Sequence, residues 1–146
     1  MIVELGTSQR TELEPAAVVR RFNEAWAAGD VDAAMRLVAD HAVYVLYISE
    51  DLLPVGGETV GRANIEAGLR AVRNQFEYLL YRPLALTTQG NDVRGQVEFM
   101  YRHRRSGELL SGRFRMVMRV EHGLIVRADE YHDRAKVEAF LRLFAS

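Results

Sequence analysis

The chain of 146 residues contains no cysteine, and its histidines number only four. Without thiols it can form no disulfide framework, no zinc site with thiolate ligands and no cysteine nucleophile. The histidines show no HxH or HExxH spacing, so no metal site is expected. The segment GGETVG lacks the Lys-Ser/Thr pair of a phosphate-binding loop. The sequence therefore predicts a protein that works without a cofactor.

A strong charge of one sign and a long apolar run are also missing. The formal net charge is −1, which predicts no nucleic-acid partner and no attraction to an anionic membrane. No apolar stretch approaches the length of a membrane span. The opening MIVELGTSQRTELEP lacks the basic and apolar regions of a signal peptide, so we expect a cytoplasmic protein.

The composition that remains is that of one globular domain. Hydrophobic residues make up 49% and charged residues 27% of the chain, and its length suits a single core. Residues 1–13 are polar and aperiodic and are predicted to form a loose N-terminal arm. Residues 14–146 are predicted to form the domain.

The hydrophobic pattern predicts an α+β fold. Apolar residues at helical spacing predict a helix that begins at Pro15 and a second, short helix capped by Asp30 that reaches Val38. Asp40-His41 is interpreted as a turn. Further helices are predicted at 62–76 and after Asp133, and residues 49–61 as a loop. Strands are predicted at 42–49, 78–88, 93–104, 109–121 and 124–132. Tight turns between the later strands favour a curved antiparallel sheet with the helices on one face.

Strand alternation indicates which side chains face the helices. Residues 114, 116, 118 and 120 share one apolar face of their strand, as do residues 97, 99 and 101 of theirs. The last strand is ambiguous. Either Leu124, Val126 and Ala128 lead into the core and bring Glu130 and His132 with them, or Ile125 and Tyr131 are core and the two titratable residues face outward.

Two segments resemble a known superfamily. The opening VVRRFNEAWAAGDVDAAMRLVADHAVY and the closing VEHGLIVRADEYHD are similar to the ketosteroid-isomerase-like superfamily, also called nuclear transport factor 2-like. Within it, the chain most resembles SnoaL-like proteins, which include polyketide cyclases. The resemblance implies a cone-shaped, cystatin-like fold in which a curved sheet wraps around helices and encloses an apolar pocket.

The resemblance does not carry over two of the superfamily's known mechanisms. Phe22, Leu46 and Met116 stand where the ketosteroid isomerases have their polar catalytic groups. The arginine–aspartate pair of limonene-epoxide hydrolases has no counterpart either. The acid that those hydrolases carry on the last strand falls at Glu130, so this residue is the one catalytic position that the resemblance retains.

Glu130 and His132 are the predicted catalytic residues. They lie two positions apart on one strand face, so both side chains could flank one substrate atom. The alternative is that both are solvated at the rim of the sheet. Asp133 is interpreted as a helix cap, and Asp129 as the surface partner of Arg127.

The sequence therefore predicts a pocket for a small, mostly apolar molecule that carries oxygen. The reaction would be an isomerisation, cyclisation or dehydration by proton transfer. The alternative is a non-catalytic binding or interaction module, which a cavity well below ~300 Å³ would favour. The predicted lining residues are Phe22, Trp26, Tyr44, Leu46, Val97, Phe99, Tyr101, Met116, Met118, Glu130 and His132. A homodimer is expected through the outer sheet face, with Met100, Val117, Ile125 and Tyr131.

Overall fold

The computed structural model describes residues 14–144, so the predicted arm at 1–13 and the last two residues lie outside the described part of the chain. The elements are α2 (Pro15–Ala27), α3 (Val31–Met35), β1 (Val38–Leu46), β2 (Gly57–Val60), α4 (Arg62–Gln75), β3 (Phe76–Pro83), β4 (Thr87–Gln89), β5 (Asp92–His103), β6 (Leu109–Glu121), β7 (Leu124–Tyr131) and α5 (Arg134–Arg142).

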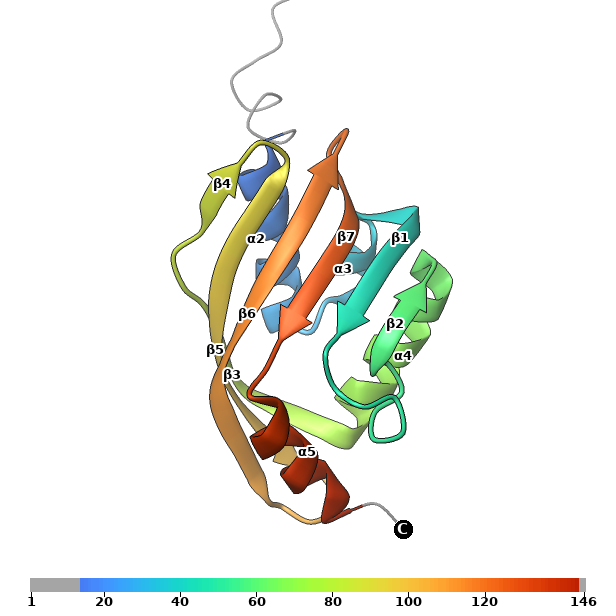
Figure 1. Cartoon of the computed structure of the whole chain (residues 1–146), viewed down its shortest axis with the longest axis vertical. Coiled ribbons are helices and arrows are strands. Elements are labelled where there is room, and N and C mark those ends of the chain that lie inside the picture. Colours follow the sequence, from blue (N-terminus) through green and yellow to red (C-terminus); the bar gives the residue numbers. More distant parts are fainter. Residues whose placement is uncertain (1–13, 145–146) are drawn as a thin grey trace, which may run out of the picture.

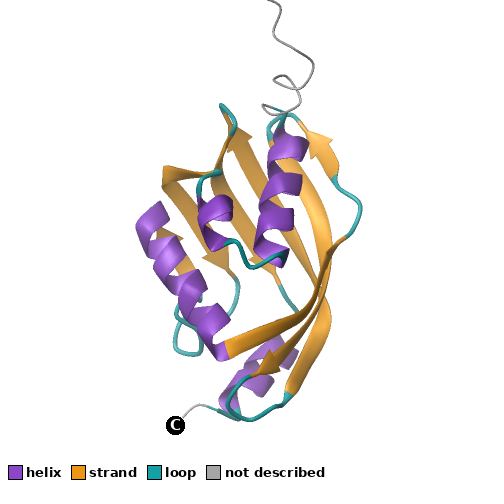
Figure 2. Ribbon diagram, turned by 180° about the vertical axis from the view of Figure 1, so that it is seen from behind, coloured by secondary structure: helices purple, strands orange, loops and turns teal. Residues whose placement is uncertain are grey.

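One curved sheet with helices on one face forms the body of the molecule, as the α+β prediction requires (Figures 1 and 2). The strands follow the order β2-β1-β7-β6-β5-β3, and β4 pairs with β5. Helices α2, α3 and α4 cover the inner face, and α5 lies beyond the end of β7. The core fills the space between the helices and the sheet, where Val18, Val19 and Trp26 of α2 are buried.

The pairing of β1 with β7 is parallel, so the prediction of a wholly antiparallel sheet is wrong at this pair. Tight turns fix the direction only of strands that follow one another in the chain. These two strands are far apart in the sequence, and no turn between neighbours constrains them. The parallel register sets Leu46 opposite Glu130, which places the end of β1 beside the end of β7.

The helix starts follow the predicted caps. The carboxylate of Asp30 accepts a hydrogen bond from the backbone N–H of Ala33 at 3.0 Å, and that of Asp133 accepts one from Lys136 at 3.3 Å. Each bond satisfies a backbone donor that a helix start leaves free. Both caps are confirmed.

The first strand begins earlier than predicted. The second helix ends at Met35 and β1 starts at Val38, so the polar pair Asp40 and His41 lies within the strand and not in a turn. The pairing register shifts between Val38 and Val43, and both polar residues face solvent. Such an irregularity lets two consecutive side chains point outward, which simple alternation forbids.

The predicted loop at 49–61 contains the short strand β2, which pairs antiparallel with β1. The four residues of β2 are too few to show an alternating pattern. Gly56 and Gly57 at its start are turn signals, so the sequence pattern predicts a loop there.

A bulge in β7 resolves the ambiguity of the last strand. Ile125 lies opposite Val120, and Arg127 lies opposite Arg119, so Val126 is an extra residue in β7. Side chains change faces at such a bulge. Ile125 is buried in the core, which corrects its expected place on the outer face. After the bulge, the inward positions are those of Ala128 and Glu130.

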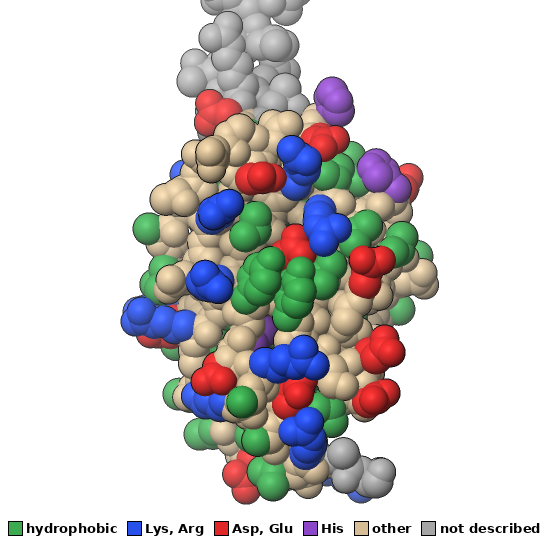
Figure 3. All heavy atoms as spheres, in the orientation of Figure 1, with side chains coloured by type: hydrophobic (Ala, Val, Ile, Leu, Met, Phe, Trp, Pro, Cys, Tyr) green, Lys and Arg blue, Asp and Glu red, His purple; other side chains and the backbone are tan. Residues whose placement is uncertain are grey.

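The outer face of the sheet carries a cluster of aromatic and charged side chains. The rings of Tyr47 and Tyr131 stack with centroids 4.5 Å apart, and the Arg115 guanidinium lies 5.7 Å from the centre of the Tyr131 ring. Figure 3 shows apolar side chains near the middle of this face, with basic side chains around them. Helices α2, α3 and α4 do not cover this face. None of the described helices is long and apolar enough to span a membrane.

Candidate functional site

A cavity of about 110 Å³ lies between the helices and the inner face of the sheet. Its walls are almost entirely apolar, and nine of the lining residues are phenylalanine, tyrosine or tryptophan. The aromatic lining residues are Phe22, Trp26, Tyr44, Phe76, Tyr78, Tyr81, Phe99, Tyr101 and Phe114. Apolar walls with few polar groups are typical of small-molecule sites.

Most of the predicted lining residues meet in this cavity. Those that line it are Phe22, Trp26, Tyr44, Leu46, Phe99, Tyr101, Met116, Met118, Glu130 and His132. Val97 does not line the cavity and is instead packed within the core. Strand alternation correctly places Val97 on the inner face, but the alternation says nothing of how far along the strand the cavity extends.

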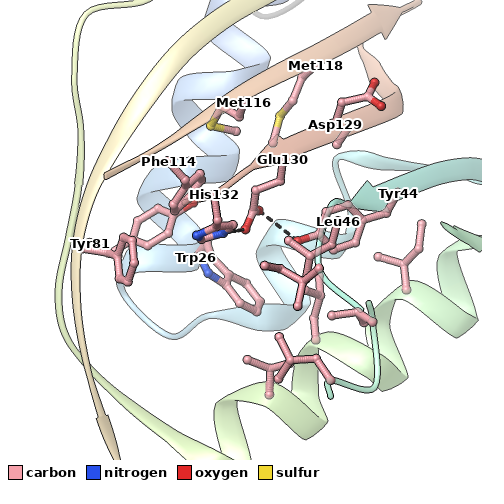
Figure 4. Close-up of a pocket in the computed structure, with 18 of the residues that line it drawn as sticks. Trp26, Tyr44, Leu46, Tyr81, Phe114, Met116, Met118, Asp129, Glu130 and His132 are labelled. Atoms are coloured by element: carbon pink, nitrogen blue, oxygen red, sulfur yellow. Dashed lines mark hydrogen bonds and ion pairs between the residues drawn. The ribbon is translucent and has the colours of Figure 1, made fainter. Parts of the chain in front are cut away.

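The polar centre of the cavity is the side chain of Glu130. The Tyr44 hydroxyl donates a hydrogen bond to Oε1 of Glu130 at 2.9 Å, and Nε2 of His132 lies 2.5 Å from Oε2. The Glu130 side chain is 22% exposed and that of His132 is 8% exposed. Figure 4 shows the three groups together, with the rings of Trp26 and Phe114 nearby.

The parallel pairing of β1 and β7 makes this contact possible. Tyr44 lies opposite Ala128 and Leu46 opposite Glu130, so all four side chains share the inner face. The sequence predicted Tyr44 and Glu130 in one pocket but not their hydrogen bond, because the register of two distant strands cannot be read from alternation.

His132 is fixed by aromatic packing and by Glu130. Its ring lies 4.6 Å from that of Phe114 and 5.5 Å from that of Phe99, measured between centroids. Within the described residues, its Nδ1 atom is buried without a partner. The tautomer that fits carries its hydrogen on Nε2, where it is donated to Glu130, and Nδ1 then has no hydrogen to place.

Burial keeps the phenols of the cavity neutral. It raises the pKa of Tyr44 well above 10.0, and the negative charge of Glu130 raises it further. Burial likewise raises the pKa of Tyr78, Tyr81 and Tyr101. At neutral pH these groups therefore act as hydrogen-bond donors and not as bases.

Tyr78 and Tyr81 were not predicted as lining residues. They lie three positions apart, so alternation sets them on opposite faces of β3. The register shifts between Tyr78 and Leu80, however, and this bulge turns both rings inward. No signal in the single sequence locates such a shift.

Asp129 has a separate environment. Its carboxylate accepts hydrogen bonds from Nε of Arg127 at 2.9 Å and from the Tyr47 hydroxyl at 3.0 Å. It points away from the Glu130 carboxylate in Figure 4. The predicted pair of Arg127 with Asp129 is confirmed. Between residues 14 and 144, no three histidine or acidic side chains are grouped so that they could hold a metal ion.

Sequence comparison relates the chain to one family. Residues 19–128 match the model of the SnoaL-like domain. No curated protein matches the chain at a significant level.

Solved structures share the fold at low sequence identity. A protein of unknown function with a cystatin-like fold from Xanthomonas campestris is 17% identical, with a TM-score of 0.77 over 88% of this chain and 98% of that one. A nuclear transport factor 2-like protein from Burkholderia thailandensis is 23% identical, with a TM-score of 0.75 over 86% and 95%. A protein with a ketosteroid isomerase-like fold from Catenulispora acidiphila, solved in complex with trimethylamine, is 16% identical, with a TM-score of 0.70 over 84% and 89%.

Proposed function

The chain belongs to the family of SnoaL-like domains, and from this premise we propose that it is an enzyme that catalyses proton transfer. The cavity binds a small, mostly apolar molecule that carries a carbonyl or hydroxyl oxygen. Glu130 is the general acid or base, and His132 is its proton partner or a hydrogen-bond donor to the substrate oxygen. The reaction is an isomerisation, an aldol-type cyclisation or a dehydration, and it needs no cofactor.

The arrangement of Glu130 is the observation that carries this proposal. Its carboxylate is partly exposed within an apolar cavity, and each of its oxygens contacts a separate donor. Two such contacts hold a carboxylate in one orientation, which proton transfer requires. In an isomerisation, Glu130 takes a proton from a carbon beside the carbonyl, and the electron pair of the broken C–H bond moves toward the carbonyl oxygen. Where a carbon–carbon double bond adjoins that carbon, the electron pair moves back from the oxygen and forms a C–H bond at the far end of the double bond with the proton that Glu130 carries, which restores the carboxylate.

The size of the cavity limits the substrate. A volume of about 110 Å³ is below the range of ~300–1,000 Å³ that is common for drug-sized ligands. The substrate is therefore a single ring or a short chain and not a multi-ring polyketide. The neighbour that binds trimethylamine supports a small ligand in this fold.

The same volume favours the alternative function, a non-catalytic module that binds a ligand or a protein. In that case Glu130 orients a ligand and no bond changes. The two functions differ in one observable: the module binds its ligand without turnover.

The test begins with the ligand that the purified protein retains, identified by mass spectrometry. On that compound or its relatives, Glu130→Gln is expected to reduce turnover by ~10²–10⁴-fold while the circular dichroism spectrum is unchanged. Glu121→Gln, which changes an exposed acid at the end of β6, is the matched control and retains activity. Full turnover in Glu130→Gln would contradict the catalytic role.

Two further parts of the proposal rest on the sequence alone. Residues 14–146 form a single domain, and the protein acts in the cytoplasm. Limited proteolysis that yields a stable fragment from about residue 14 onward tests the first, and cell fractionation tests the second.

A further inference from the structure

The carboxylates of the cavity lining are not matched by lysine or arginine side chains within that lining. Two carboxylates, those of Asp129 and Glu130, belong to lining residues, and no lysine or arginine does. The charge of Asp129 is matched by Arg127 on the outer side of the sheet. Among residues 14–144, no lysine or arginine pairs with Glu130, whose partners are the phenol of Tyr44 and the ring of His132. The carboxylate of Glu130 therefore faces the cavity without a lysine or an arginine beside it.

This charge influences the whole inner wall. Burial is the main cause that raises the pKa of Tyr44, Tyr78, Tyr81 and Tyr101, and the Glu130 carboxylate raises each of them further. Arg73 lowers the pKa of Tyr78 and Tyr81, but in both cases Glu130 has the larger effect.

Arg73 is held away from Glu130 by other contacts. Its guanidinium lies over the rings of Trp26 and Tyr78, at 4.6 and 4.2 Å from their centres. One of its nitrogens donates to the backbone carbonyl of Trp26 at 2.8 Å. These contacts hold Arg73 away from the cavity, whose lining residues do not include it.

The walls around Glu130 suit a cation. The face of an aromatic ring attracts positive charge, and a group of such rings recognises quaternary ammonium ions. In Figure 4 the rings of Trp26, Tyr44 and Phe114 lie near the Glu130 carboxylate, and the ring of Tyr81 lies farther from it, beyond His132. An anion in the same place would face both the carboxylate and the negative ring faces.

Hydrogen bonding and size narrow the type of cation. Both oxygens of Glu130 already have a donor, so a primary ammonium would find few acceptors for its three N–H groups. A fully alkylated ammonium has no N–H group to satisfy. A cavity of about 110 Å³ admits only a small ion, such as a tri- or tetramethylammonium ion.

We propose that the cavity binds small alkylammonium ions, with the positive charge against Glu130 and the methyl groups against the aromatic rings. This ligand class rests on the proposed use of the cavity for binding, and not on the proposed proton transfer.

Three probes of similar shape and different charge test the proposal. Isothermal titration calorimetry or ligand-observed NMR compares tetramethylammonium, tert-butanol and trimethylacetate. We expect tetramethylammonium to bind at least ~10-fold more tightly than tert-butanol, because cation–π contacts strengthen when desolvated, and trimethylacetate to bind most weakly. Equal or tighter binding of tert-butanol would overturn the proposal, and so would the absence of binding by all three probes.

Two variants test whether Glu130 causes the preference for the cation. Glu130→Gln is expected to keep the affinity for tert-butanol and to lose most of the preference for tetramethylammonium, while Glu121→Gln keeps that preference. A preference unchanged in Glu130→Gln also overturns the proposal. The catalytic proposal is contradicted by a different result, namely a retained ligand that binds without turnover, whichever probe binds best. If turnover depends on Glu130 but the cavity shows no preference for the cation, the ligand proposal is wrong and the catalytic proposal stands.

Discussion

At the scale of single residues, Tyr44 and Tyr47 form a natural comparison. Each hydroxyl donates to a carboxylate, at 2.9 and 3.0 Å, but Tyr44 is 8% exposed and Tyr47 is 38% exposed. We expect Tyr44→Phe to lower the free energy of unfolding by ~1–3 kcal/mol, because it removes a buried hydrogen bond to a charged group. Tyr47→Phe is the control and should cost less, since water can replace its bond. Equal losses in urea unfolding would contradict the buried network.

The tyrosines also predict a delayed alkaline titration. Five of the six have a raised pKa, and that of Tyr47 is raised to about 12, first by its hydrogen bond with Tyr131 and then by Asp129. A folded-state pKa above the unfolded value contributes stability that is complete below pH ~10 and is lost as the pH rises further. We expect phenolate absorbance of the native protein to develop well above pH 10 and to coincide with unfolding. Full ionisation near pH 10, as in urea-unfolded chain, would contradict the burial of these rings.

Some residues of the site could be predicted and others could not. Glu130 follows from the resemblance of the last strand, and Asp133 follows from its place before a helix. Tyr78 and Tyr81 could not be found, because a bulge in β3 overrides alternation. Ile125 was misplaced for the same reason in β7. A bulge depends on how two strands pair, and one strand's sequence does not contain that information.

At the scale of elements, Val55 anchors the connection between β1 and β2 onto α4. Val55 is 1% exposed, and a Cβ at Gly68 would lie 2.0 Å from its Cγ1 atom. Gly68→Ala improves helix propensity by up to ~1 kcal/mol but overpacks this contact, which costs ~1–3 kcal/mol. We expect a net loss of stability by chemical denaturation. In a Val55→Ala background the same substitution should become neutral or stabilising, and an equal loss in both backgrounds would refute the contact.

Glu138 joins α5 to the same connection. Its carboxylate accepts a hydrogen bond from the backbone N–H of Ser49 at 2.8 Å and one from Nε of Arg134 at 2.8 Å. The bond from Ser49, followed by the pair with Arg134, lowers the pKa of Glu138 from 4.5. A lowered folded-state pKa contributes stability above pH ~4.5 that is lost as the pH falls through the folded value.

Glu138→Gln should therefore reduce stability at pH 7 and flatten the acid branch of the stability curve. Unfolding by denaturant at pH 7 and in acid measures both effects. Glu108→Gln, an exposed acid in the turn between β5 and β6, is the control and keeps the acid branch of the wild type. An acid branch of wild-type slope in Glu138→Gln would show that this carboxylate does not hold α5.

Most elements were predictable because their patterns are long. The boundaries of β6 follow its alternation over Leu109–Glu121. The start of α2 follows its first residue, Pro15, and that of α5 follows its cap, Asp133, and both helices have an apolar stripe. The failures concern short or irregular elements. The four residues of β2 show too little pattern, and the early start of β1 is hidden by the consecutive polar pair Asp40 and His41.

At the scale of the whole molecule, helices cover one face of the sheet and leave the other face available for contact with a second copy of the chain. The resemblance and the alternation both predict one helical layer, and the structure has it. The opposite face carries apolar side chains among charged ones (Figure 3). The stacked rings of Tyr47 and Tyr131 lie on it, and strand alternation places Val117 there as well. A mixed surface of aromatic residues and arginine is typical of protein interfaces.

A homodimer through this face remains our prediction. Light scattering of the wild type should give a mass near twice 16.6 kDa at micromolar concentration. Val117→Glu places a charged side chain in the middle of the face, between Arg94 and Asp129, and should yield the monomer mass with an unchanged circular dichroism spectrum. Leu143→Glu is the matched control, because Leu143 is 71% exposed and follows α5, beyond the end of β7. A wild-type mass of 16.6 kDa, or dissociation by Leu143→Glu alone, would show that this sheet face is not the interface.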